Sequence, residues 1–531
     1  MFPINLRTPL VSTAALSFIV VSRLAVGASP HEVARRNADL AAPALTEMHR
    51  WLHEVALRKI DPKTKLFRAT GDSWNYRDTA ADCYPFLGWA AYFTDRDAFE
   101  GPVRDALRAE IKLCSHHGPI PVNYNLRAGK KEVNQRYDSV VFGASEYMKD
   151  GLVAVVEATG HGEWLDRMRA IADELWQRAS IETPSGKLVS SNLEVNGDHM
   201  QVLVRLFGLT GNQLYLKYAR RIADYYLNNP AFLPRHLDDH GCELIGGLGL
   251  LQGVESTVAP EREKRYRPLM KKMLDAILER GLNSDGLMLH TLADTPGPHD
   301  DKPLTDNWGY NYVSFYCYYL VTGDTKYRDV IRTPLVNLAK PKYHLYPWEG
   351  RNIDGHADSI EGGLYLLSVM PVEEGIKWAD REVADALIGK PIGGTSKFEC
   401  NAIRTVTLYA LSKTQGIHVP KWRNDLRLGA ARDGDGVVIF ISAQRPWQGK
   451  LIFDIPRHKR WFNFKHDWPR INYLPEYFTV NPDKWYRVKI GSGKPLMGAT
   501  TGKSLRRGLP IKLAAGEELV VVVKRRRIIV D

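Results

Sequence analysis

The stretch "DDHGCELIGGLGLL", residues 238–251, decides the fold because the chain uses its pattern again as "DGHADSIEGGLYLL", residues 354–367. Both stretches read D-x-H, then five free positions, then G-G-L-x-L-L. A polar start followed by an apolar, glycine-rich helix therefore occurs twice, 116 residues apart. Self-similarity of this kind is typical of repeat architectures, so we expect one structural unit to recur along the chain.

The recurring unit is a pair of helices. Some segments place apolar residues at spacings of three and four, which predicts helices with one exposed face: 163–179, 213–227 and 266–282. Others, such as 310–321, are poor in charge and rich in aromatics, which predicts helices buried on most of their surface. Threonine-glycine junctions recur before the amphipathic helices, at Gly160, Gly211 and Gly323. One pair therefore recurs about every 50 to 60 residues.

A chain of such pairs either stacks as an open solenoid or closes into a ring. An open solenoid needs polar concave helices, whereas the apolar helices of this chain carry polar residues mainly at their starts. This favours a mainly α-helical, (α/α)6-type toroid of six or seven hairpins. The inner helix starts would line a funnel, near residues 82, 142, 198, 243, 310, 358 and 401.

The pattern changes after about residue 424, where β-branched residues lie between Gly, Pro and Asp turns. We predict a small β-sandwich over 425–531, packed on a toroidal catalytic domain over 29–424. Residues 1–28 hold a short apolar run that ends in small residues, which predicts a signal peptide and a secreted or periplasmic protein. An uncleaved anchor is the alternative. No later segment is apolar enough to span a membrane, so we expect no membrane association after cleavage.

Composition narrows the function classes. The chain has 531 residues, 44% hydrophobic and 25% charged, which is typical of a globular protein and excludes disorder and fibres. Its five cysteines show neither zinc-ligand nor disulfide-framework spacing, so we predict buried free thiols. The formal net charge is +11 without a nucleic-acid docking motif. This charge favours attraction to an acidic polymer, with solubility alone as the alternative.

Each predicted inner helix start places polar residues in an apolar setting. Aromatic rings pack on the apolar faces of sugars, while Asp, Asn, His and Arg satisfy sugar hydroxyls, so these clusters are typical of a carbohydrate site. The predicted catalytic carboxylates are Asp198, Glu243 and Asp358. The predicted substrate-binding residues are Trp74, Arg77, His199, His240, Asp306, Trp308, Tyr310, Arg351 and His356.

Three structural interpretations compete with this one. Asp and Asn at helix starts are ordinary caps of free backbone N–H groups, although capping does not explain the His, Trp and Tyr beside them. The two matched histidines suggest a metal, but they also follow from the duplicated architecture, so we predict no metal and no other cofactor. The repeated Gly-Gly pairs predict close approach of neighbouring helices.

The sequence resembles the six-hairpin, (α/α)6-toroid enzymes that act on carbohydrates, which include secreted bacterial glycosidases and polysaccharide lyases. The resemblance rests on the helix-pair repeat from about 45 to 415, on the threonine-glycine junctions, on the trailing β domain and on "SWNYRDTAAD", "DNWGYNY" and "DGHADSIEGG". It is strongest to uronic-acid-directed members such as unsaturated glucuronyl hydrolases and β-glucuronidases. The resemblance implies Asp or Glu catalysis at the funnel and matches no family motif residue by residue.

These observations predict a secreted glycoside hydrolase that cleaves an acidic polysaccharide or oligosaccharide with a carboxylate acid/base pair. A polysaccharide lyase is the first alternative, with Asn196 or Arg77 neutralising a uronate and His199, His356 or Tyr310 as the base. A helical-repeat protein that binds glycans without catalysis is the second. We expect no nucleic-acid partner.

Overall fold

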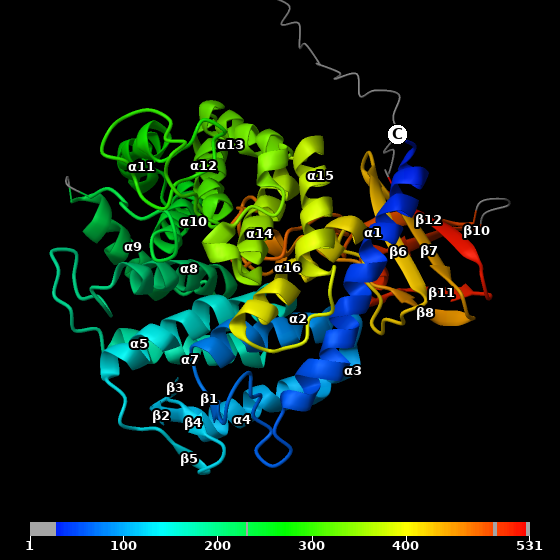
Figure 1. The fold of residues 1–531 in the computed structure, drawn as a ribbon, viewed down its shortest axis with the longest axis horizontal. Helices are drawn as coiled ribbons and strands as arrows, with labels where there is room; N and C mark the ends of the chain where they lie inside the picture. The colour runs from blue at the N-terminus through cyan, green and yellow to red at the C-terminus, as the bar shows by residue number, and fades with distance from the viewer. Residues whose placement is uncertain (1–27, 230–231, 492–495, 527–531) are drawn as a thin grey trace, which may run out of the picture.

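The computed structural model describes residues 28–229, 232–491 and 496–526, so the predicted signal peptide lies almost wholly outside the described residues. Helices form a ring, and a β domain lies against one side of it (Figure 1). The outer helices are α1 (Pro30–Trp51), α4 (Arg104–Cys114), α7 (Glu163–Gln177), α9 (Gln213–Leu227), α11 (Pro260–Arg280), α13 (Lys326–Asn337) and α15 (Glu373–Glu382).

The inner segments alternate with these outer helices along the chain. Six are single helices, of which the first five are α2 (Tyr84–Thr94), which follows a π-helical turn over Asp78–Cys83, α8 (Leu193–Thr210), α10 (Cys242–Val258), α12 (Trp308–Thr322) and α14 (Ile353–Val369). A further inner segment runs from α5 (Tyr137–Glu146) through a π-helical turn, Tyr147–Leu152, into α6 (Val153–Thr159). The last is α16 (Lys397–Thr414).

Consecutive inner segments pack against one another, and α16 returns to pack against α2, which closes the ring. The helical toroid that the sequence predicts is confirmed. Within the described residues the ring has seven inner segments, which matches the higher of the two predicted hairpin counts.

Small residues allow the inner helices to approach closely. A side chain at Gly362 on α14 would lie 2.8 Å from the Cα atom of Gly309 on α12. A side chain at Gly247 on α10 would lie 2.8 Å from the Cβ atom of Met200 on α8. One glycine of each repeated Gly-Gly pair therefore makes a helix-helix contact, as predicted.

The β domain contains a five-stranded antiparallel sheet of order β10-β9-β12-β7-β6 and a two-stranded ribbon of β11 and β8. Helix α1 covers β6 and β7 on one face, where Ala34 and Ala38 pack with Val438 and Phe440. The strands are β6 (Leu426–Asp433), β7 (Gly436–Ala443), β8 (Trp447–Leu451), β9 (Trp485–Ile490), β10 (Leu496–Thr501), β11 (Leu509–Leu513) and β12 (Glu518–Arg525).

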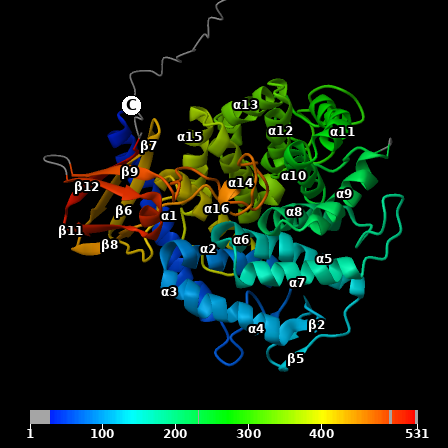
Figure 2. The same ribbon diagram turned by 180° about the vertical axis from the view of Figure 1, so that it is seen from behind.

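Residues 457–476, which we call the basal segment, close the ring at the end opposite the inner helix starts (Figure 2, orange). Arg470 and Arg205 of α8 both bind the buried carboxylate of Glu157 on α6, at 2.7 and 2.8 Å. Asn472 donates to Asp150 at 2.6 Å. The cationic stretch 457–470 is thus partly interior, and Arg457 and Arg470 are paired with carboxylates inside the fold.

The remaining elements are short. The connection before the second inner segment forms β2 (Ser115–His117), β3 (Ile120–Pro121), β4 (Tyr124–Asn125) and β5 (Lys130–Lys131). Strand β1 (Ser73–Trp74) precedes the first inner segment and pairs with β4. Short helices are α3 (Arg96–Ala98), α17 (Arg457–Arg460) and α18 (Gly502–Arg507). None of the helices in the described ranges combines the length and hydropathy needed to cross a membrane.

Candidate active site

Acidic side chains converge on the ring axis near the starts of the inner helices. These acids are close enough to shift one another's pKa values. Besides burial, the charges of Asp150 and Asp354 raise the pKa of Asp82, and those of Asp358 and Asp239 raise the pKa of Asp306. Six of the seven inner segments supply carboxylates, and the seventh, α16, supplies Lys397 and Arg404. The carboxylate ring consists of Asp82, Glu146, Asp150, Glu194, Asp198, Asp239, Glu243, Asp306, Asp354, Asp358 and Glu361.

These carboxylates are not helix caps. The inner helices α8 and α14 are capped by Asn192 and Asn352, and α16 begins with a capping box at Ser396. Because other side chains satisfy the free N–H groups, Asp198 and Asp358 lie one turn or more inside their helices with their oxygens directed elsewhere. The capping interpretation is therefore wrong for these two acids.

Two buried cations hold part of the ring in ion pairs. The Lys149 ammonium lies 2.9 Å from Asp150 and 3.3 Å from Glu243. Arg404 contacts Glu361 at 2.7 Å and also pairs with Asp358. The neighbouring carboxylates hold the pKa of Lys149 well above its ordinary value although burial opposes the charge. The ion-paired carboxylates of the ring are thus those around Lys149 and Arg404.

Two other acids are poised to hold a proton near neutral pH. Burial raises the pKa of Asp82 to about 8, and the negative charges of Asp150 and Asp354 add to this effect. Burial, with the charge of Asp358, raises the pKa of Asp354 to about 7 although Asn401 donates a hydrogen bond to it at 2.8 Å. Asp82 is the more accessible of the two, since Asp354 is buried. The site therefore combines protonated acids with ion-paired carboxylates.

Asp198, a predicted catalytic residue, lies beneath the ring surface. It is 1% exposed, and neither carboxylate oxygen has a hydrogen-bond partner among the described residues. Burial raises the pKa of Asp198 well above its ordinary value, although the Lys149 charge opposes this. A neutral, buried Asp198 is adjacent to the site without facing open space, which makes it the weakest of the three predicted catalytic residues.

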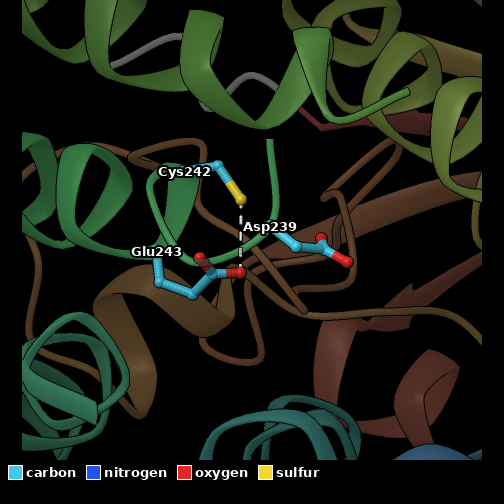
Figure 3. A group of neighbouring side chains, drawn as sticks. All are labelled: Asp239, Cys242 and Glu243. Carbon is cyan, nitrogen blue, oxygen red and sulfur yellow. Dashed lines mark hydrogen bonds between the residues drawn. The ribbon is translucent and has the colours of Figure 1, made fainter. Parts of the chain in front are cut away.

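Glu243 belongs to a group that offers metal ligands. Ligand atoms of Asp239, Cys242 and Glu243 lie within 4.8 Å of one another (Figure 3). The Cys242 thiol donates to Glu243 Oε1 at 3.2 Å, and the Lys149 ammonium contacts the same oxygen. Burial raises the pKa of Cys242 well above its ordinary value, so the thiolate that a metal requires is disfavoured. The Lys149 ammonium supplies the positive charge that a metal ion would otherwise bring to this group.

The three predicted histidines have different surroundings. His240 has a left-handed backbone, φ +78°, and its ion pair with Glu194 raises the pKa of the imidazole to about 9. His356 is partly buried, and burial lowers its pKa. His199 is fully buried, with one ring nitrogen 3.1 Å from the Ser145 hydroxyl and the other accepting from an indole N–H. His199 is thus a core residue, which corrects its predicted role in binding substrate or acting as a base.

The predicted aromatic residues are mostly structural. Trp308 is fully buried and donates its indole N–H to Ser359 at 2.9 Å, and Trp74 is 2% exposed. Neither indole has a free face for a sugar ring, so their predicted binding role is wrong. Tyr310 is buried and donates to Glu361 at the ring. Asp306 belongs to the carboxylate ring, and the side chain of Arg351 lies outside the described part of the structure.

A cavity of about 570 Å³, the mouth cavity, opens beside the ring. The Arg77 side chain, 51% exposed, lines it and lies 3.1 Å from Glu146 of the ring. Tyr76 and Phe142 add aromatic surface to the same wall. The full lining is Asn75, Tyr76, Arg77, Asp78, Asn123, Arg136, Asp138, Ser139, Phe142 and Gly143. Arg77 is thus positioned between the mouth cavity and the acidic centre.

Sequence reasoning missed the two cations that organise the ring. Lys149 lies in "EYMKDG" and Arg404 in "ECNAIRTV", both within inner segments that are otherwise apolar. A lone cation inside an apolar helix was the available signal, since a buried charge requires a partner. Asp82 and Asp354 were noticeable at helix starts, but only the packed ring raises their pKa values.

No protein-family model matches the chain, and no curated protein matches it. A GH127 β-L-arabinofuranosidase from Geobacillus stearothermophilus T6 is similar in structure over 94% of this chain and 76% of its own, with 13% identity and a TM-score of 0.36. A GH76A α-1,6-mannanase from Salegentibacter sp. is similar over 71% of this chain and 99% of its own, with 11% identity and a TM-score of 0.38. The unsaturated glucuronyl hydrolase from Bacillus sp. GL1 is similar over 54% of this chain and 88% of its own, with 13% identity and a TM-score of 0.36. At these values, function is inferred from the site.

Proposed function

We propose that this protein is a glycoside hydrolase whose reaction takes place at the carboxylate ring. Cleavage of a glycosidic bond needs one protonated carboxyl to protonate the leaving oxygen and a second, ionised carboxylate to activate water or stabilise the cationic sugar. The observation that carries the proposal is that the ring presents both an acid with a raised pKa and an ion-paired carboxylate, on the two inner segments that flank α16. Asp82 has a pKa of about 8, and Asp358 is held in an ion pair by Arg404.

Within this proposal, Asp82 is the proton donor and Asp358 the carboxylate. Asp82 is the more accessible of the two acids with a near-neutral pKa, so it meets a substrate more readily than Asp354. Glu243, paired with Lys149, is a second candidate carboxylate. Asp198 has no direct contact with the substrate in this proposal, because its burial leaves no surface for contact with a sugar, and its role is to position the neighbouring groups.

The proposed substrate is an acidic glycan. Carboxylates outnumber cations in the ring, so the anionic group of a substrate is disfavoured at the centre and needs a cationic site nearby. Arg77 and Arg136 line the mouth cavity, where a guanidinium can pair a carboxylate or sulfate in a bidentate manner. The proposal includes a secreted or periplasmic location, which the apolar run and small residues in 1–28 support.

The test is to incubate the protein from Ser29 onward with uronic-acid and sulfated polysaccharides and to measure reducing ends and absorbance at 232 nm in parallel. Reducing ends without new absorbance at 232 nm are the expected result. Absorbance that rises with the reducing ends would indicate β-elimination and replace the hydrolase with a lyase. Binding without turnover on any glycan would favour the non-catalytic alternative.

A further inference from the structure

One face of β9 is exposed beside helix α1. Strand β9 alternates exposed and buried residues: Trp485, Arg487 and Lys489 point outward, while the side chains between them are buried. Val522 of β12 lies opposite Lys489 in the sheet and packs with the residues beneath α1. Because neighbours across a sheet share a face, these three side chains continue the face that α1 covers over β6 and β7. Helix α1 packs on β6 and β7, and β12 separates these two strands from β9 in the sheet.

Trp485 is unusual in this position. Its side chain is 48% exposed, on a strand paired on both sides within the sheet. The residues that neighbour it and Arg487 on β10 are Thr501 and Ala499, whose small side chains leave the indole uncovered. An exposed tryptophan on a flat sheet presents an apolar ring of the kind that packs on the face of a sugar.

Cations surround this indole. Arg487 and Lys489 are exposed and have no carboxylate partner among the described residues. Lys524 lies opposite Arg487 and pairs with Asp433 at 2.7 Å, so it adds less free charge. Side chains at alternate strand positions lie about 7 Å apart, so the row from Trp485 to Lys489 extends roughly 13 Å. A row of this length suits an extended anionic chain better than a single small ion.

We propose that this β9 face, defined by Trp485, Arg487, Lys489 and Lys524, is a second binding site that docks an acidic polysaccharide away from the carboxylate ring. A sugar ring packs on the indole, and carboxylate or sulfate groups pair with the cations. The identity of the ligand rests on the proposed function, because the same polymer is the proposed substrate. An anionic membrane is the weaker interpretation, since the face has no other large apolar side chain that is exposed among the described residues.

The test is affinity electrophoresis of the full chain in gels that contain dextran sulfate or neutral dextran. We expect retardation by dextran sulfate alone, weakening with added salt. Trp485→Ala raises the apparent Kd about fivefold to tenfold, and Arg487→Glu with Lys489→Glu raises it at least about tenfold. A matched control, Lys217→Glu with Arg265→Glu, changes the same charge on the exposed surfaces of α9 and α11 and stays within about twofold.

Equal loss in the control pair, or no loss in the β9 variants, would overturn the proposal. Stronger retention on vesicles of phosphatidylcholine and phosphatidylserine than on dextran sulfate would assign the face to a membrane instead. The β9 variants keep their activity on short soluble oligosaccharides, because the ring is unaltered. If no glycan is hydrolysed but dextran sulfate still binds through Trp485, the proposed hydrolase fails while this binding site stands.

Discussion

At the scale of single residues, burial sets the chemistry of the ring. Asp82 and Asp358 are the same residue type on the two inner segments that flank α16, yet burial and nearby carboxylates act on one while the other is paired with Arg404. A low-dielectric setting with like charges favours the neutral acid, and a guanidinium favours the ion. One type of side chain thereby supplies both the acid and the carboxylate that hydrolysis needs.

Asp82→Asn removes the proposed proton donor. We expect kcat on a hydrolysed glycan to fall about 10²- to 10⁴-fold, since this is the usual contribution of a positioned general acid. The alkaline limb of kcat/KM in the unmodified protein should lie near pH 8, where Asp82 loses its proton. Asp354→Asn is the matched control: it removes a charge that raises the pKa of Asp82, so the limb moves to lower pH. An unchanged kcat in Asp82→Asn would exclude this residue as the donor.

The raised pKa of Asp82 also predicts how stability depends on pH. Between its ordinary value of 3.8 and about 8, the folded state holds a proton that the unfolded state releases, so stability falls as pH rises through this window. Asp82→Asn removes this dependence. We expect the variant to gain stability relative to the unmodified protein between pH 5 and 8, by about 1–3 kcal/mol at pH 8. Urea unfolding at both pH values measures it, and a constant difference would contradict the prediction.

At the scale of elements, the inner helices are spaced by glycine. The contact between Gly309 and Gly362 brings α12 and α14 together, and this fixes Asp358 and Glu361 relative to Tyr310. The left-handed His240 shows a related effect, because the strained turn before α10 aims its ring at Glu194. Backbone spacing and turn geometry therefore determine which polar groups meet.

Gly362→Ala tests the role of this spacing. The new methyl group would lie 2.8 Å from the Gly309 Cα atom, so the helices must separate. We expect a loss of about 1–3 kcal/mol in the free energy of unfolding, which is typical of overpacking, together with reduced activity. Gly101→Ala is the control, since nothing lies within 4 Å of a side chain there. Equal melting temperatures for the two variants, measured by circular dichroism, would argue against a tight helix contact.

At the scale of the whole molecule, the basal segment joins the β domain to the ring. Glu157 is fully buried between Arg205 and Arg470. Its carboxylate is therefore stabilised in part by Arg470, which lies 313 positions further along the chain. Asn472 continues the connection to Asp150 at the base of the carboxylate ring. Removing one of the two arginines leaves the buried carboxylate only partly compensated, which costs more than loss of a surface pair.

Arg470→Met tests this connection. We expect about 3–5 kcal/mol of destabilisation, because Glu157 keeps its charge and loses its bidentate partner. The control is Arg460→Met in the same segment, where the pair with Asp483 is partly exposed and should contribute about 0–1 kcal/mol. Guanidinium unfolding monitored by tryptophan fluorescence separates the two. Similar midpoints for both variants would show that the basal segment does not hold the ring together.

The sequence by itself determined the repeat, the closed helical ring, the β-rich C-terminal region and the close helix contacts at the Gly-Gly pairs. These features follow from local periodicity and residue size, which a linear pattern records. The tertiary structure alone decided which polar residues form the site. In the folded chain His199, Trp74 and Trp308 lie in the core, and Lys149 and Arg404 lie at the carboxylate ring. Burial and charge pairing depend on neighbours distant in sequence, so protonation and exposure arise only when the ring closes.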